Sequence, residues 1–210
     1  MRVFRRRRIV STGLASCMLF PGAVQAATKL LTPPGTEGPF YPDILPLDTD
    51  NDLVRIGADG KQAAGQIFHL MGRVVNSGGR PYPRFSVEIW QCDANGVYGH
   101  RGDRGRGKPD PYFQGFGTTV TRENGGYRFR TITPVSYPGR TPHIHFKIKA
   151  PNRREFTSQL YLSGHPRNDS DFLYRRLGKP EAQRAASVRL ISAPELDRGA
   201  VKGTFDIVLI

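Results

Sequence analysis

The sequence predicts an all-β fold, an antiparallel β-sandwich with long loops. Apolar and polar residues alternate over several short runs, which is the two-residue period of a half-buried strand. Turn-forming segments such as Asn76-Ser77-Gly78-Gly79 and Asn124-Gly125-Gly126 separate these runs. The 210 residues include 24 Gly and 17 Pro, a composition that favours a loop-rich β fold over a helical bundle.

Residues 1–26 have the features of an export signal peptide. Residues 5–8 are all arginine, residues 9–20 are modestly apolar, and Val24-Gln25-Ala26-Ala27 offers small residues to a signal peptidase. The paired arginines indicate the twin-arginine type. We therefore expect a periplasmic or secreted protein, with a membrane-anchored lipoprotein cleaved at Leu14-Ala15-Ser16-Cys17 as the alternative. Because no apolar run of about 18 residues occurs, we expect no permanent membrane span.

The chain is strongly basic, which raises the question of an anionic partner. The formal net charge is +13, and without residues 1–26 it is +8, from 26 basic and 18 acidic residues. The loop 99–117 resembles the arginine–glycine segments that bind RNA. Its basic residues are Arg101, Arg104, Arg106 and Lys108. The segment is short and occurs once, so we interpret it as a surface loop and expect no nucleic-acid partner.

Residues 27–66 are predicted to be irregular, and residues 67–210 to form the β-sandwich domain. The predicted strands cover residues 66–75, 85–91, 115–121, 127–132, 143–149, 158–162 and 204–209. Short helices are predicted at 172–176 and 180–186. About eight short strands in this pattern are typical of a prealbumin- or immunoglobulin-like sandwich. Cys92 is the one cysteine after residue 26, so we expect no internal disulfide and a buried, apolar role for it.

A histidine pair is the first candidate for chemistry. In the predicted strand 143–149, His143 and His145 alternate with Ile144 and Phe146, so both imidazoles project from one face. Such a pair can hold one zinc, copper or iron ion, and it also occurs by chance. No Asp or Glu lies between residues 124 and 152, which counts against a local site of two histidines and one carboxylate.

Tyrosine offers another kind of ligand. Tyr98 ends the second predicted hairpin region, and Tyr137 stands just before the histidines. Phenolate is a hard oxygen donor that suits Fe(III), and coordination removes its proton well below the usual pKa of about 10. For either tyrosine alone, a half-buried aromatic residue is the commoner structural interpretation.

Five ordered pieces between residues 32 and 209 carry a family resemblance. They are Thr36-Glu37-Gly38-Pro39-Phe40-Tyr41, the run from Val87 to Tyr98, the run from Gly125 to Ile132, the run from Tyr137 to Phe146, and Thr157-Ser158-Gln159-Leu160-Tyr161. In combination they resemble the intradiol ring-cleavage dioxygenases, the non-haem iron(III) enzymes that include catechol and protocatechuate 3,4-dioxygenases.

The resemblance implies a site and a reaction. The implied Fe(3+) ligands are two phenolates and two imidazoles: Tyr98, Tyr137, His143 and His145. Arg140 matches the arginine that lies over the bound aromatic ring, Gln159 matches a glutamine beside it, and Tyr137 is the implied base. The implied reaction inserts both atoms of O2 into a catechol-type ring with intradiol cleavage to a muconate-type dicarboxylic acid.

The chain departs from the familiar enzymes of this family in one respect. Five residues separate Tyr137 from His143, where those enzymes carry a longer insert that walls the substrate pocket. We therefore expect a more open site, with Tyr112 and Phe113 of the loop 99–117 supplying a wall. The alternative function is a non-catalytic, prealbumin-like binding module. The sequence leaves open whether the chain forms a homo-oligomer.

Overall fold

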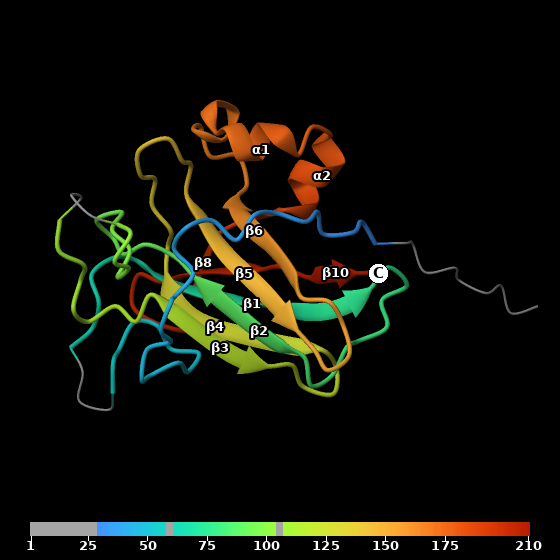
Figure 1. Ribbon diagram of the computed structural model, residues 1–210, viewed down its shortest axis with the longest axis horizontal. Helices are drawn as coiled ribbons and strands as arrows, with labels where there is room; N and C mark the ends of the chain where they lie inside the picture. Colours follow the sequence, from blue (N-terminus) through green and yellow to red (C-terminus); the bar gives the residue numbers. More distant parts are fainter. Residues whose placement is uncertain (1–28, 58–60, 104–106) are drawn as a thin grey trace, which may run out of the picture.

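Two five-stranded β-sheets pack face to face in the computed structural model, which describes residues 29–57, 61–103 and 107–210 (Figure 1). The predicted export signal lies outside these residues. The first sheet contains β1 (Ile67–Asn76), β4 (Gly126–Ile132), β8 (Ile191–Ser192), β9 (Val201–Thr204) and β10 (Ile207–Leu209). The second contains, in spatial order, β3 (Phe116–Val120), β2 (Ser86–Trp90), β5 (His143–Lys149), β6 (Phe156–Leu162) and β7 (Ser187–Val188). The helical elements are the 3-10 helix η1 (Asn168–Ser170), α1 (Phe172–Arg176) and α2 (Pro180–Ala185).

The predicted two-sheet, mostly β architecture is confirmed, but wholly antiparallel pairing is wrong. The strand β1 pairs antiparallel with β4, whereas β9 and β10 both run parallel to it. A further parallel pair joins β6 to β7. Parallel neighbours need long connections, and the alternation within a strand does not reveal its partner's direction.

The predicted strand 204–209 takes in the last residue of β9 (Val201–Thr204), a break, and β10 (Ile207–Leu209), so residues 201–203 of β9 were not predicted. The break lies at Phe205 and Asp206, where the amide of Arg73 donates to the Asp206 carboxylate at 3.1 Å. A side chain therefore takes the place of a backbone acceptor, and the ladder along β1 is interrupted. The other predicted strands and both helices begin and end within two residues of their predicted limits, while the two-residue strands β7 and β8 were not predicted.

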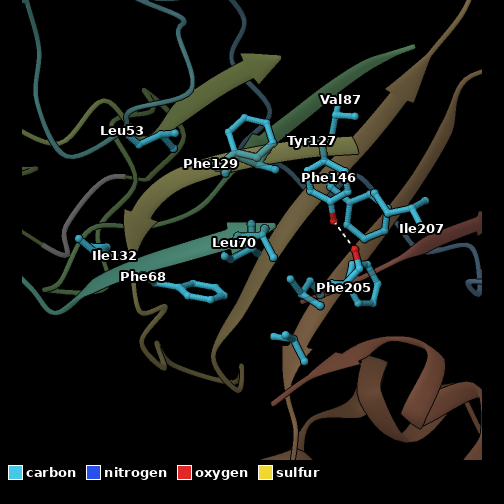
Figure 2. Packing of buried hydrophobic residues seen from close by; sticks show 14 of the residues in the cluster. Leu53, Phe68, Leu70, Val87, Tyr127, Phe129, Ile132, Phe146, Phe205 and Ile207 are labelled. Atoms are coloured by element: carbon cyan, nitrogen blue, oxygen red, sulfur yellow. Dashed lines mark hydrogen bonds between the residues drawn. The ribbon is translucent and has the colours of Figure 1, made fainter. Parts of the chain in front are cut away.

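The core lies between the sheets and is rich in aromatic rings (Figure 2). Phe68 and Leu70 of β1 face the same interior as Val87 of β2 and Phe146 of β5, and all four are almost fully buried. The buried Tyr127 hydroxyl donates to the Phe205 carbonyl at 2.6 Å, which satisfies both groups where β9 ends. Cys92 is buried, as predicted.

Gly72 of β1 is the tightest backbone approach in the described part of the first sheet. A Cβ built on Gly72 would overlap the carbonyl oxygen of Phe205, the acceptor of the Tyr127 hydroxyl. We expect Gly72→Ala to lower the free energy of unfolding by about 3 kcal/mol, because the backbone after β9 must shift. Urea denaturation measures this loss.

Gly99→Ala is the matched control. Beyond its chain neighbours, no described atom lies within 4 Å of a Cβ built there, and the φ of Gly99 lies outside the left-handed region. The expected change is within about 0.5 kcal/mol. Equal stability losses in the two variants would refute the close-packing argument.

Candidate metal centre

The two faces of β5 carry different chemistry. Ile144, Phe146 and Ile148 point into the core, while His143 and His145 lie on the opposite face of the sheet. Both imidazoles are nevertheless buried, each only 1% exposed. Their Nε2 atoms lie 3.2 Å apart. The prediction that the two histidines share a face is therefore confirmed, and the nitrogens are close enough to share one ion.

Both histidines are held neutral. His143 Nδ1 donates to the Thr141 carbonyl at 2.7 Å, so its Nε2 carries the lone pair. Burial, with a contribution from the nearby Arg140 charge, lowers the pKa of His143 to about 3. Burial and then His143 itself depress the pKa of His145 well below its usual value. Two neutral imidazoles facing one point are a preformed pair of metal donors.

A tight turn places Tyr137 and Arg140 beside this pair. Pro138 and Gly139 are its central residues, Gly139 has a φ of +79°, and the Arg140 amide donates to the Tyr137 carbonyl at 2.9 Å. Pro followed by a left-handed Gly is the signature of a type II turn. The Tyr137 hydroxyl lies 3.5 Å from His143 Nε2, and Arg140 Nη1 lies 3.2 Å from the same nitrogen.

Tyr98 reaches the site from the loop after β2. The Asp93 carboxylate organises this loop by accepting from the amide of Val97 at 2.9 Å. The Tyr98 ring stacks on Phe40 at 4.5 Å and meets the Tyr137 ring edge-on at 5.8 Å. Its buried hydroxyl has no hydrogen-bond partner among the described residues. Burial, reinforced by Tyr137, raises the pKa of Tyr98 well above 10, so without a cation the phenol stays protonated.

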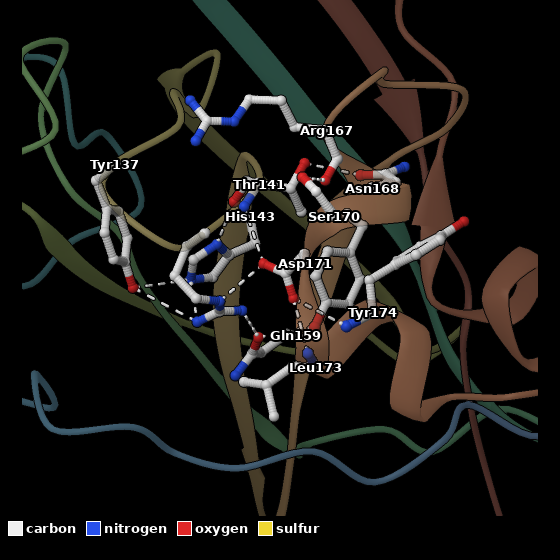
Figure 3. A network of polar contacts seen from close by, with 12 residues as sticks. Tyr137, Thr141, His143, Gln159, Arg167, Asn168, Ser170, Asp171, Leu173 and Tyr174 are labelled. Carbon is white, nitrogen blue, oxygen red and sulfur yellow. Dashed lines mark hydrogen bonds and ion pairs between the residues drawn. The ribbon is translucent and has the colours of Figure 1, made fainter.

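Gln159 joins Arg140 to the neighbouring strand (Figure 3). It lies opposite His145 in the β5–β6 register. Its Oε1 accepts from Arg140 Nη2 at 2.6 Å and from the Tyr161 hydroxyl at 2.9 Å. Its Nε2 donates to the Thr36 carbonyl at 3.0 Å. The structure thus brings all six sequence-predicted site residues into one cluster: Tyr98, Tyr137, Arg140, His143, His145 and Gln159.

Asp171 belongs to this cluster and was missed from the sequence. Its carboxylate is buried and accepts from Arg140 Nε at 2.8 Å and from the Thr141 amide at 2.9 Å. Burial alone would raise its pKa, but the hydrogen bonds from Tyr174, Thr141 and Arg140 lower it overall. An Asp immediately before a short helix is a recognisable N-cap, yet nothing local indicates a partner 31 residues away.

Residues 34–41, here called the strap, cover the outer face of β5. Gly38 has a φ of +73° and packs against the His145 ring, where a Cβ would lie 3.1 Å from Cε1. Tyr41 anchors the strap, since its hydroxyl donates to Glu88 at 3.0 Å and its ring lies under the Lys147 ammonium at 3.7 Å. The sequence indicated an irregular segment here but not its position over the site.

A cavity of about 450 Å³ opens beside Gln159. The strap, β6 and α1 line it with Pro34, Gly35, Thr36, Ser158, Gln159, Tyr161, Leu173, Arg176 and Leu177. The described part of the loop 99–117 supplies none of this lining. It borders a smaller hollow of about 120 Å³ beside Tyr98, with Phe113 in its wall, while Tyr112 is partly exposed. Phe113 of this loop therefore borders Tyr98 and not the cavity beside Gln159.

The arrangement can bind a metal ion. Two neutral imidazoles and two phenols converge in a buried site, and burial also raises the pKa of Tyr137, although Arg140 opposes the rise. An unpartnered, buried hydroxyl is costly unless it finds a ligand. A highly charged cation would displace the phenol protons and satisfy all four donors.

Comparisons with known proteins agree with this site. A family model described as Dioxygenase matches residues 36–210. The chain is 35% identical to the protocatechuate 3,4-dioxygenase beta chain of Burkholderia cepacia over 176 residues, covering 80% of this chain and 73% of that one. It is 30% identical to the catechol 1,2-dioxygenase of Acinetobacter baylyi over 161 residues, and the match covers 68% of this chain and 50% of that enzyme.

Solved structures show the same fold. The dioxygenase domain of a dioxygenase and carbohydrate-binding protein fusion from Streptomyces sp. SirexAA-E superposes with a TM-score of 0.66 at 32% identity. The superposition covers 85% of this chain and 97% of that domain.

The two low histidine pKa values predict that the metal-free protein loses stability in acid. The folded pKa of His143 is about 3, while the unfolded value is about 6.5, so the unfolded chain binds more protons between these limits. As the pH falls from about 6.5, His143 should therefore cost about 1.4 kcal/mol of unfolding free energy per pH unit. His145 acts in the same direction.

Urea denaturation of the metal-free protein at several pH values between about 7 and 4.5 measures the slope. This slope reports how many protons the chain takes up on unfolding, and in His143→Leu that number should fall by about one. An unchanged slope in that variant would show that His143 titrates normally in the folded state.

Proposed function

Because the chain belongs to the intradiol ring-cleavage dioxygenase family, we propose that it inserts both atoms of O2 into a catechol-type ring. The ring opens between its two hydroxylated carbons, giving a muconate-type dicarboxylic acid. The observation that carries the proposal is the convergence of two phenols and two imidazoles in one buried site. Arg140 and Gln159 lie directly beside it.

The proposed cofactor is a non-haem ferric ion. Its four ligands would be the phenolates and imidazoles described above: Tyr98, Tyr137, His143 and His145. Hard phenolate oxygens suit Fe(III), and the unpartnered Tyr98 hydroxyl fits a ligand role. When bound, the ion would supply the Lewis acidity that makes an ortho-diphenol acidic near neutral pH and its ring reactive toward O2.

Tyr137 is the base in this proposal. The two histidines hold their neutral form down to acidic pH, so they are poor acceptors for a substrate proton. Tyr137 differs from Tyr98 because it is only partly buried and lies 3.5 Å from Arg140 Nη1. As the phenolate that the bound ion would hold, its oxygen could take a proton from the substrate hydroxyl, and the guanidinium would stabilise the substrate oxyanion that remains.

In this proposal Arg140 and Gln159 orient the substrate, and Arg140 stabilises its negative charge. Arg140 keeps its positive charge at any relevant pH. Placed beside the reacting ring, it would stabilise negative charge that develops there by about 2–4 kcal/mol. The cavity beside Gln159, about 450 Å³ in volume, is the proposed entrance for the aromatic ring.

The alternative of a non-catalytic binding module explains less. A module that binds through its sheets has no need of two tyrosines and two histidines directed at one buried point, nor of an arginine at 3.2 Å from them. The named relatives, among them enzymes for catechol and hydroxyquinol, act on related substrates. We propose no single catecholic substrate among them.

We also propose that the protein is exported to the periplasm or secreted. The support is the basic start, apolar segment and small-residue cleavage site of residues 1–26. In the ranges that the structure describes, no helix is both long and apolar enough to cross a membrane.

Iron content, visible spectrum and oxygen uptake test the proposed function together. The purified protein should contain about one iron per chain, have a wine-red colour from tyrosinate-to-iron charge transfer, and consume O2 with catechol, protocatechuate or hydroxyquinol. A colourless protein with stoichiometric iron would contradict the assignment of the phenolate ligands.

Tyr137→Phe tests the base. Loss of the phenol oxygen should shift the visible band and lower kcat by about a hundredfold or more, because the substrate proton loses its acceptor. Tyr82→Phe is the matched control, since the Tyr82 hydroxyl donates to the C-terminal Ile210 carbonyl, away from the site. The control should keep both colour and kcat. Activity that survived His145→Ala would also overturn the ligand set.

A further inference from the structure

We propose that Asp171 is a positioning residue for the ring-cleavage reaction. Its buried carboxylate holds Arg140 so that the two terminal nitrogens of the guanidinium face the metal centre and the substrate. The inference rests on the proposed function and adds to it a residue on a separate segment of the chain.

The four hydrogen bonds of Asp171 leave its carboxylate little freedom (Figure 3). One oxygen, Oδ1, accepts from the amides of Leu173 and Tyr174, both at 2.9 Å, and so caps α1. The other, Oδ2, accepts from Arg140 Nε at 2.8 Å and from the Thr141 amide at 2.9 Å. The side chain is 0% exposed. A carboxylate engaged on both oxygens and excluded from water is a rigid anchor.

The guanidinium of Arg140 is held on three sides. Nε points to Asp171, Nη2 to Gln159 Oε1 at 2.6 Å, and Nη1 to His143 Nε2 at 3.2 Å. A long arginine side chain loses rotamer entropy when it is fixed, so a free arginine would not keep this pose without a partner. Asp171 binds the guanidinium through Nε, so Nη1 and Nη2, which contact His143 and Gln159, face the site.

The cap of α1 and the contact with Arg140 are separable roles of one side chain. Capping needs only Oδ1, whereas both bonds to Oδ2 come from the turn after Tyr137. Asn and Ser are as good as Asp at N-cap positions. Either substitution keeps an acceptor for α1 and removes the charge that pairs with Arg140, so Asp171→Asn and Asp171→Ser isolate the second role.

The experiment measures oxygen uptake by the iron-loaded wild-type protein and its variants. Catechol, protocatechuate and hydroxyquinol are the probes, and the one turned over fastest is carried forward. In both Asp171 variants we expect kcat to fall about tenfold or more while KM changes less than about threefold, because Arg140 acts on charge that develops after binding. A loosened cavity wall would instead raise KM, since Leu173 and Leu177 of the capped segment line the cavity.

A double-mutant cycle with Arg140→Ala decides whether Asp171 acts through Arg140. If it does, adding Asp171→Asn to Arg140→Ala lowers kcat no further. Asn168→Ala is the matched control: Asn168 is buried in the same segment and accepts from the Thr141 hydroxyl at 2.8 Å, but it makes no hydrogen bond or ion pair with Arg140. The loss of kcat caused by Asn168→Ala should combine independently with the loss caused by Arg140→Ala.

Failure of the positioning role for Asp171 and failure of the proposed function give different results. Multiplicative loss of kcat in the Asp171→Asn, Arg140→Ala double variant, or a change in KM alone, would overturn the positioning role while leaving the proposed function intact. No oxygen uptake by the wild-type protein with any ortho-diphenol would overturn the proposed function itself. Urea unfolding of the same metal-free variants gives a readout without turnover: coupling between Asp171 and Arg140 is expected, and strictly additive losses would refute the contact.

Discussion

The position of β5 in the middle of the second sheet, with both of its faces buried, is the constraint on which the site depends. One face must be apolar because it closes the sandwich, and Ile144, Phe146 and Ile148 meet that need. The two-residue period then directs the intervening side chains to the other face. His143 and His145 lie there at a depth where the charged imidazolium is strongly disfavoured. The fold itself thus keeps both imidazoles neutral, with the Nε2 atoms of His143 and His145 close together.

The strap covers part of that second face, and ion pairs contribute to holding it there. Lys147, the next outward residue after His145, pairs with Glu37 of the strap and lies over the Tyr41 ring. Lys149 pairs with Glu88 at 2.7 Å, and Glu88 accepts from the Tyr41 hydroxyl. Lys147 and Glu88 are the buried members of this set, so removing the partner of either would leave an uncompensated charge. The outward row of β5 therefore changes from the two buried histidines to Lys147, which pairs with the strap.

The sequence predicted what is local and left out what is long-range. The alternation in β5 and the short helix at Phe172–Arg176 both follow from patterns a few residues long. The parallel partners of β1 and the break at Phe205 depend on which strands pair with β1. The alternation of apolar and polar residues within one strand does not specify that pairing. The six predicted site residues owe their roles to a family resemblance. Asp171 was missed because its partners, Arg140 and Thr141, lie about 30 residues earlier in the chain.

The charges around Arg140 explain how a buried cation can remain available to a substrate. An isolated guanidinium at this depth would be costly, and pairing with Asp171 offsets the cost. If Asp171 bound the two terminal nitrogens, as in a fork-to-fork pair, the charge would be directed away from the metal centre. It binds Nε instead, so Nη1 and Nη2 face His143 and Gln159. The site therefore keeps a fixed positive edge next to two neutral imidazoles, and an anionic diphenolate bound in the proposed site would meet that edge.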